Sequence, residues 1–288
     1  MVRILDLPHF FRPSTSHVYP PFKNGKYMEE YFYDSFQELD CNHIYIPIFW
    51  TNIQNHPGFS KMKEKYNHIL RNAFHKILSI HPNAQFFTIV QHDDGPLLYL
   101  PNNTVIFGAC TGKIPLPLIY QDITNKLSLV PRVKKDMLAS FVGSYTHPIR
   151  QEMYDVFSDK YDCICHVKNK WTSNVQENDA NTFIDLTLRS KFCLSPRGYG
   201  RSSFRFFEAI LLDTIPVYFW DDIEWLPYKD ILDYSLFSIS IAKKDIPYTY
   251  DILSSISDAR YEEMCKELQR VKYFFTLDYM SIYISNNL

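Results

Sequence analysis

Basic and hydroxyl side chains gather around a short glycine-containing loop late in the chain, within Ser190–Asp222. Guanidinium groups pair well with phosphate oxygens, and the N–H groups at a helix N-terminus favour an anion. Glycine lets the main chain approach such an anion closely. These residue types in this order predict a site for a diphosphate. The residues concerned are Arg197, Gly198, Gly200, Arg201, Ser202 and Ser203.

The residues around this loop predict the elements that position it. Phe192–Leu194 is short and apolar, which indicates a buried strand. Ser203–Leu212 repeats apolar residues at helical spacing and begins with a residue suited to an N-cap. Thr214–Trp220 predicts a second buried strand. Strand, loop, helix and strand together form half of a nucleotide-binding unit, with the ligand expected at the loop.

Further along the predicted helix, Arg205 and Glu208 share a stripe with Arg201, because they lie at i, i+4 and i+7. Glu208 would lie about 4.5 Å beyond Arg205 along the helix axis, at about 1.5 Å rise per residue. At that depth a carboxylate can accept hydrogen bonds from two ribose hydroxyls. The alternative is that Arg205 and Glu208 form an ion pair on a solvated helix surface.

A second candidate loop follows the predicted strand Gln85–Val90. It contains His92, Asp93 and Asp94, which supply an imidazole and two carboxylates. Because function in parallel α/β sheets lies past the carboxyl ends of strands, any of these could act as a general base. The alternative is a simple turn, since Asp-Asp-Gly-Pro is good turn chemistry by itself.

Another strand–loop–helix unit places one more arginine near a helix N-terminus. Ala139–Gly143 predicts a strand, and a helix is expected over Ile149–Phe157, with Arg150 in its first turn. Arg150 could face the same anion as Arg197, or it could be a solvated helix arginine. Both interpretations remain open at this point.

Alternating strands and helices along the whole chain predict α/β architecture with parallel sheets. The apolar pattern breaks near Leu129–Met137, so we expect an N-terminal domain over 1–135 and a C-terminal domain over 136–288. The last predicted helix, Asp258–Phe275, could pack back on the N-terminal domain. Other predicted elements are helices over Tyr27–Leu39, Lys61–Ser79 and Asn181–Arg189 and strands over His43–Trp50 and Ser235–Ile241.

Composition excludes several classes of protein. The net charge of −2 argues against nucleic acid as the main partner. The six cysteines are scattered, which fits reduced thiols in a cytoplasmic protein, and Cys163–His166 is better explained as a core strand than as a metal site. We find neither a signal peptide nor an apolar run of about 18 residues, so we expect no transmembrane segment in this sequence. Either the protein is soluble or a membrane-anchoring stem lies outside this sequence.

Residue chemistry alone leaves three functions open. Gly198-x-Gly200-x-x-Ser203, with Asp221 further on, is a degenerate dinucleotide fingerprint, which would suit an NAD(P)-dependent oxidoreductase. The second function is a sugar transferase of two α/β domains, and the third is a nucleotide- or carbohydrate-binding module without turnover. The Walker pattern of P-loop NTPases is absent, and so is an Asp-x-Asp triplet that would bind a metal–diphosphate.

The segment FCLSPRGYGRSSFRFFEAILLDTIPV resembles the most specific motif of the exostosin-like glycosyltransferases, family 47. Ala139–Gly143 with Arg150 is similar to a second motif of that family, and His92–Pro96 is similar to a third, with Asp94 in place of Trp. The chain departs from the family at Asp213, where Gly is common, which we expect to alter only a helix C-terminus.

The resemblance implies a GT-B fold, in which two Rossmann-like domains face each other across a cleft. It implies an inverting glycosyltransferase that needs no metal ion, with a UDP-sugar as donor and a glycan as acceptor. UDP-xylose is our first choice of donor. The compact chain, without a stem, is similar to virus-encoded members of the family.

The mechanism expected from the resemblance is direct displacement at the anomeric carbon. A group of the loop His92, Asp93 and Asp94 removes the proton of the acceptor hydroxyl, with Glu29 and Glu30 next in line as the base. Positive charge stabilises the departing diphosphate in place of a metal ion. The residues expected to bind the donor are Arg150, Arg197, Gly198, Gly200, Ser202, Ser203, Arg205 and Glu208.

Overall fold

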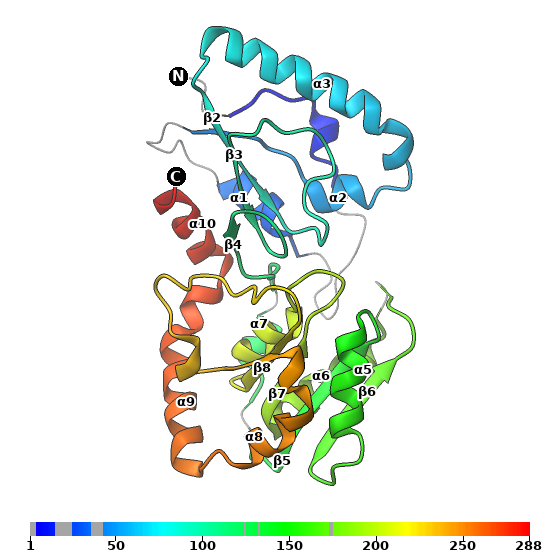
Figure 1. Ribbon diagram of the computed structural model, residues 1–288, viewed down its shortest axis with the longest axis vertical. Coiled ribbons are helices and arrows are strands. Elements are labelled where there is room, and N and C mark those ends of the chain that lie inside the picture. The colour runs from blue at the N-terminus through cyan, green and yellow to red at the C-terminus, as the bar shows by residue number, and fades with distance from the viewer. Residues whose placement is uncertain (1–3, 15–24, 36–42, 124, 132, 173–174) are drawn as a thin grey trace. The chain divides into compact units, whose positions relative to one another are not determined.

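The computed structural model describes residues 4–14, 25–35, 43–123, 125–131, 133–172 and 175–288 (Figure 1). Its contacts divide the described residues into two compact units. The first unit takes its residues from Met1–His17, Lys26–Gln121 and Leu277–Leu288. The second takes its residues from Val18–Gly25 and Asp122–Thr276. Each unit contains one parallel sheet with helices, so the predicted α/β class is confirmed.

The sheet of the first unit has the strand order β1-β2-β3-β4, and every neighbouring pair is parallel. Strand β2 lies in the middle, and both of its faces are buried, as expected for a parallel sheet. Its carboxyl end leads directly into the loop that contains His92. The strands are β1 (His43–Tyr45), β2 (Gln85–Val90), β3 (Thr104–Gly108) and β4 (Ile114–Pro115).

Helices α3 (Phe59–Ile80) and α1 (Met28–Ser35) cover opposite faces of this sheet. Phe74 of α3 contacts Phe86, and Phe32 of α1 contacts Phe87, with ring centroids 5.1 and 6.1 Å apart. Successive residues of a strand point to opposite faces, so the two helices lie on different sides. The short helix α2 (Trp50–Gln54) follows β1.

The sequence predicted one strand over His43–Trp50, and this was wrong in its second half. Strand β1 ends at Tyr45, and Trp50 already begins α2. Pro47 lacks an N–H group and cannot continue a sheet ladder, which accounts for the early end. Helix α1 covers the predicted Tyr27–Leu39 only as Met28–Ser35, and residues 36–39 lie outside the described part of the chain.

The sheet of the second unit has the order β6-β5-β7-β8-β9, again with all pairs parallel. The chain leaves β5 toward β6 and then crosses back to β7, so β5 and β7 are neighbours at a topological switch point. Ligands of open α/β sheets bind outside the carboxyl ends of strands at such a point. The strands are β5 (Met137–Ser144), β6 (Cys163–Lys168), β7 (Ser190–Pro196), β8 (Ile215–Trp220) and β9 (Ile239–Ala242).

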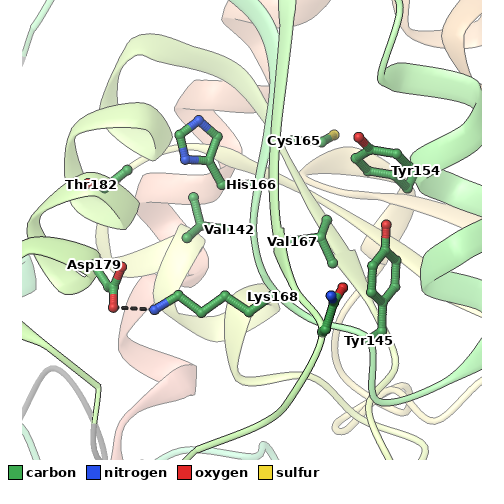
Figure 2. Close-up of a pocket in the computed structure, with 10 residues that line it drawn as sticks. Val142, Tyr145, Tyr154, Cys165, His166, Val167, Lys168, Asp179 and Thr182 are labelled. Carbon is green, nitrogen blue, oxygen red and sulfur yellow. Dashed lines mark hydrogen bonds and ion pairs between the residues drawn. The ribbon is translucent and has the colours of Figure 1, made fainter.

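Three helices connect these strands: α5 (Pro148–Phe157), α6 (Glu177–Arg189) and α7 (Phe204–Leu211). Helices α6 and α7 pack on β5, β7 and β8, whereas α5 packs on β6 and β7 and against the 3-10 turn Lys243–Tyr248 and α8 (Thr249–Ser254). Figure 2 shows the alternation along β6 that separates α5 from α6, because Cys165 points toward Tyr154 of α5 and His166 toward Thr182 of α6. Cys163–His166 is part of strand β6, as predicted.

The C-terminal part of the chain differs from prediction in two places. The strand expected over Ser235–Ile241 begins only at Ile239, after a 3-10 turn over Tyr234–Leu236. Helix α9 (Asp258–Val271) and the 3-10 turn after it belong to the second unit. A further helix, α10 (Leu277–Asn286), packs against α1 in the first unit. The expected boundary at residue 135 stays a prediction.

Candidate functional site

The switch point of the second unit is held together by Arg150, which comes from the first turn of α5. Its Nε donates to the carbonyl oxygen of Arg197 at 2.9 Å, and its Nη2 donates to that of Pro196 at 3.2 Å. Its Nη1 donates to the carbonyl oxygen of Ser144 at 2.8 Å. Arg150 is buried, so the interpretation as a solvated helix arginine was wrong. This side chain joins the carboxyl ends of β5 and β7 and leaves a positive charge between them.

Arg197 is also buried, and it holds the loop that follows β7. Its guanidinium donates to the carbonyl oxygens of Tyr199 and Gly200, each at 3.2 Å. The same group pairs with Asp221 and Asp222, at the end of β8, and the Nη1 to Asp222 distance is 2.8 Å. The sequence interpretation did not find these carboxylate partners, although two adjacent aspartates at a strand end were the available signal.

Asp222 has a second arginine partner, since the Nε of Arg201 donates to it at 2.8 Å. Burial favours the neutral carboxyl, but the hydrogen bonds from Arg201 and from the N–H of Ile223 outweigh it and hold the pKa of Asp222 below its usual value. Both arginines that flank the glycine loop are therefore tied to the end of β8. These bonds hold the loop in one position relative to β8.

Two hydroxyl groups at this switch point have no hydrogen-bond partner among the described residues. They are Ser203 Oγ, just before α7, and Thr146 Oγ1, just after β5, and both atoms are buried. Ser203 occupies the N-cap position of α7, yet its side chain makes no capping bond. Buried hydroxyls are normally satisfied, so these two, one of them at the N-terminus of α7, are available to a polar ligand. Thr146 was not predicted from the sequence.

Gly198 lies beside the same groups. A methyl group added at its Cα would be 3.4 Å from Arg150 Nη2 and 3.8 Å from Thr146 Oγ1. It would be 3.9 Å from the carbonyl oxygen of Ser202, which already accepts a hydrogen bond from the N–H of Gly198 at 3.1 Å. The positive charge, the free hydroxyl and the glycine thus surround one small space.

Arg205 and Glu208 form an ion pair, as the alternative interpretation expected, but not on a solvated surface. Glu208 is only 3% exposed, and the guanidinium of Arg205 lies 4.0 Å from the ring centre of Phe183 in α6. The Nε of Arg205 donates to the carbonyl oxygen of Val142 at 2.8 Å, so α7 is also joined to β5. Binding of a ribose by Glu208 stays a prediction.

A cavity of about 530 Å³ lies at the carboxyl ends of β5 and β6. Val142 lines this cavity, and so does Thr182, the residue before Phe183. Figure 2 shows an ion pair between Lys168 and Asp179 at its α6 side. The remaining lining residues are Tyr145, Tyr154, Cys165, His166, Val167 and Asn169.

In the first unit, the loop after β2 forms a turn, closed by a hydrogen bond from the N–H of Gly95 to the carbonyl oxygen of His92 at 3.0 Å. Asp93 and Asp94 expose their side chains. His92 Nδ1 accepts a hydrogen bond from the N–H of Asp94 at 3.2 Å, and burial lowers the pKa of His92. This hydrogen bond engages Nδ1 of the His92 ring with the main chain of its own loop. Which of the three side chains removes the proton of the acceptor stays a prediction.

The two carboxyl groups considered next in line for the base are both buried. Glu29 is fully enclosed, and burial raises its pKa to about 8 against the opposing hydrogen bonds from Gln91 and Thr51. Glu30 accepts a hydrogen bond from the N–H of Tyr27 at 3.0 Å. An enclosed carboxyl group cannot contact an acceptor, so Glu29 is excluded as the base in this conformation.

The described residues contain no group of three His, Cys, Asp or Glu side chains placed to hold a metal ion. Burial raises the pKa of Cys163 and Cys165 to about 12, which keeps both thiols protonated. Among the helices in the described part of the chain, none combines the length and the apolar character needed to cross a membrane.

Comparison with known proteins gives the class to which this fold and site belong. The model of the exostosin GT47 domain matches residues 71–256, more than half of the chain. The chain therefore belongs to the exostosin GT47 family, and the sequence-based resemblance is confirmed. The matched residues include the His92 loop and the whole switch point of the second unit.

Individual relatives include proteins of two plants. The chain is 34% identical over 260 residues to "Probable beta-1,4-xylosyltransferase IRX10L" of Arabidopsis thaliana, covering 75% of this chain and 59% of the relative. It is 34% identical over 248 residues to "Probable glucuronosyltransferase Os01g0926600" of Oryza sativa subsp. japonica, with the same coverage. It is 28% identical over 215 residues to "Probable glycosyltransferase At5g25310" of Arabidopsis thaliana, of which it spans 43%. The chain thus spans 43–59% of the length of these relatives.

Solved structures show only a distant likeness. TarM aligns with a TM-score of 0.41 and 11% identity, over 75% of this chain and 52% of TarM. The GtfA/B complex aligns with a TM-score of 0.40 and 9% identity, over 75% of this chain and 47% of the other.

Proposed function

We propose that this chain is a glycosyltransferase that moves a sugar from a UDP-sugar to a hydroxyl group of a glycan, with inversion at the anomeric carbon. Membership of the exostosin GT47 family supports this, and the matched relatives include a protein named as a xylosyltransferase and one named as a glucuronosyltransferase. UDP-xylose is the first donor to test. The proposal includes a GT-B fold with two α/β domains.

The observation that carries the proposal is the pair of buried, unsatisfied hydroxyls at the switch point, Ser203 Oγ and Thr146 Oγ1. A diphosphate at the N-terminus of α7 would accept hydrogen bonds from both. The buried guanidinium of Arg150 would lie beside it, with Arg197 beneath the loop. As the bond to the sugar breaks, negative charge grows on the diphosphate, and fixed positive charge stabilises it without reorganisation.

The cavity lined by Val142 and Thr182 suits the nucleoside. With a ribose at Glu208, the base would extend past Val142 and Thr182 into the cavity on its α6 side. Polar side chains that line this part, among them His166 and Lys168, could read the edge of a pyrimidine.

Of the three residues in the first-unit loop, the carboxylates of Asp93 and Asp94 are the better candidates for the base. They are exposed, whereas His92 is only partly exposed and its Nδ1 already accepts a hydrogen bond from the N–H of Asp94. In the proposed step, a carboxylate takes the proton of the acceptor hydroxyl as the oxygen attacks the anomeric carbon. The bond between that carbon and the diphosphate oxygen breaks, and UDP leaves with the electron pair.

The test uses the unsatisfied hydroxyls. Ser203→Ala and Thr146→Val should each leave the ligand-free protein as stable as the parent, or about 1 kcal/mol more stable, because they remove a buried polar group without a partner. The same variants should bind UDP about tenfold more weakly by calorimetry, since each loses a hydrogen bond to a charged ligand. Unchanged UDP affinity in both variants would refute the assignment of the diphosphate site.

A parallel titration of the parent protein separates the function classes. Binding of NAD without UDP would favour the oxidoreductase. UDP binding without sugar transfer or donor hydrolysis would favour a binding module. Transfer that continues in EDTA would support the metal-independent mechanism.

A further inference from the structure

A network of buried polar side chains holds the main chain just before the exposed loop of the first unit. The N–H of Gln91, the residue before His92, donates to Glu29 Oε1 at 2.8 Å. The side chain of Gln91 in turn accepts a hydrogen bond from the N–H of Met28 at 3.1 Å. Glu29 is completely buried and Gln91 is 4% exposed. Helix α1 and the end of β2 are therefore joined by two reciprocal bonds.

A second buried side chain holds the main chain just after the loop. Gln54, the last residue of α2, donates from Nε2 to the carbonyl oxygen of Gly95 at 2.9 Å. Its Oε1 accepts a hydrogen bond from the N–H of Leu97 at 2.7 Å. The amide nitrogen and the amide oxygen of Gln54 are thus both bonded to main-chain groups that follow Asp93 and Asp94 in the chain.

The two attachments are linked through α2. Thr51, in the first turn of α2, donates from its N–H to Glu29 Oε2 at 3.2 Å and from its hydroxyl to Glu29 Oε1 at 3.1 Å. One buried carboxyl group therefore fixes α2 and the entry of the loop at once, and Gln54 fixes the exit from the same short helix. Movement of the loop would require several of these bonds to break together.

Burying a carboxyl and two carboxamides is costly compared with burying apolar side chains, even when their hydrogen bonds are made. An exposed turn whose only task was to reverse the chain would not need such support. Catalytic groups do need it, because a displacement of about 1 Å can reduce the rate about 100-fold. The supported loop carries two exposed carboxylates and an oriented imidazole.

We propose that Glu29 and Gln54 are positioning residues, which hold the loop of His92, Asp93 and Asp94 in the geometry required for proton removal from the acceptor. This rests on the proposed transferase function. Neither side chain contacts substrate, and both act through the main chain that flanks the loop.

The experiment compares three variants of the full chain with one control. Gln54→Met keeps the size of the side chain but loses both bonds to the loop. Glu29→Ala removes the carboxyl group, and Glu29→Gln keeps an acceptor for the N–H of Gln91. The control is Thr88→Val, which removes two buried hydrogen bonds of the same unit, with Trp50 and Ile46, and neither bond involves a residue of the loop.

We expect kcat for sugar transfer to fall 10- to 100-fold in Gln54→Met and Glu29→Ala, at a temperature where each variant is fully folded, while UDP affinity stays within twofold of the parent. Glu29→Gln should recover most of the rate, and Thr88→Val should change it less than twofold. Equal kcat in Gln54→Met and the control would overturn the proposal, as would a parallel loss of UDP affinity. If the parent itself binds no UDP, the failure lies in the proposed function and not in the positioning role.

Discussion

Substituting Gly198 by alanine tests the diphosphate site with a single methyl group. Gly198 does not have a positive φ, and the three nearest atoms would lie 3.4 to 3.9 Å from the new carbon, which is ordinary contact distance. The fold should therefore accept the methyl group. Because alanine restricts the unfolded chain more than glycine does, the free energy of unfolding should rise by about 0.4–1 kcal/mol. The methyl group would nevertheless fill the space between Arg150 and Thr146.

The expected loss of binding follows from what occupies that space when UDP is bound. A displaced phosphate oxygen loses at least one hydrogen bond of a charged acceptor, which is worth about 1.5–3 kcal/mol. Because about 1.4 kcal/mol corresponds to a factor of ten, UDP should bind about 10- to 100-fold more weakly. Calorimetric titration measures this directly, and thermal unfolding without ligand provides the stability.

The matched control is the same change at Gly95, for which we expect the opposite effect on the stability of the protein. Gly95 has φ of +71°, and an added methyl group would lie 2.3 Å from Thr111 Oγ1. Gly95→Ala should thus lower the melting temperature of the protein, whereas Gly198→Ala should not. A Gly198→Ala protein that binds UDP as tightly as its parent would refute the reasoning, because the diphosphate would then lie elsewhere.

Three further predictions concern other parts of the chain. The pKa of Glu29 is raised in the folded state to about 8 from 4.5, so its contribution to stability is complete below about pH 4.5 and is lost as pH rises through 8. The melting temperature should fall over this interval in the parent and stay flatter in Glu29→Gln. Asp93→Ala or Asp94→Ala should reduce kcat by about 10²–10⁴-fold if that residue is the base, and rates unchanged in both would remove the loop from the mechanism. Asp213→Gly relieves a φ of +52° but loses an ion pair with Lys272, so its unfolding free energy should change by less than about 1 kcal/mol in denaturant titration.

The sequence was sufficient for the elements whose signal is local. Gln85–Val90 is a run of apolar and β-branched residues, and it forms β2 over the same residues. The predicted helix Ser203–Leu212 is α7, within one residue at each end. The strand predicted over His43–Trp50 failed because apolar residues at the start of a buried helix look like the continuation of a buried strand. Only the structure shows that Trp50 has left the sheet.

The roles of the arginines could not be predicted in the same way. Arg150 contacts main-chain atoms 46 and 47 residues away, and no local pattern indicates such a bond. The partners of Arg197 at the end of β8 are also distant in sequence. Residue type and spacing correctly predicted that these arginines lie at one loop. They could not show that most of their N–H groups are already used to hold that loop.

This difference gives a physical criterion for separating supporting groups from binding groups. Arg150, Arg197 and Glu29 donate to or accept from the main chain in the ligand-free fold, so their substitution should disturb the loops they hold. Ser203 and Thr146 have buried hydroxyls without a partner among the described residues, so their substitution should leave the fold intact and weaken the ligand. If Arg197→Lys reduces stability and Ser203→Ala does not, while both weaken UDP, the two kinds of contribution are separated. If Ser203→Ala lost as much stability as Arg197→Lys, the Ser203 hydroxyl would have a hydrogen-bond partner in solution. The argument for a ligand at the N-terminus of α7 would then fail.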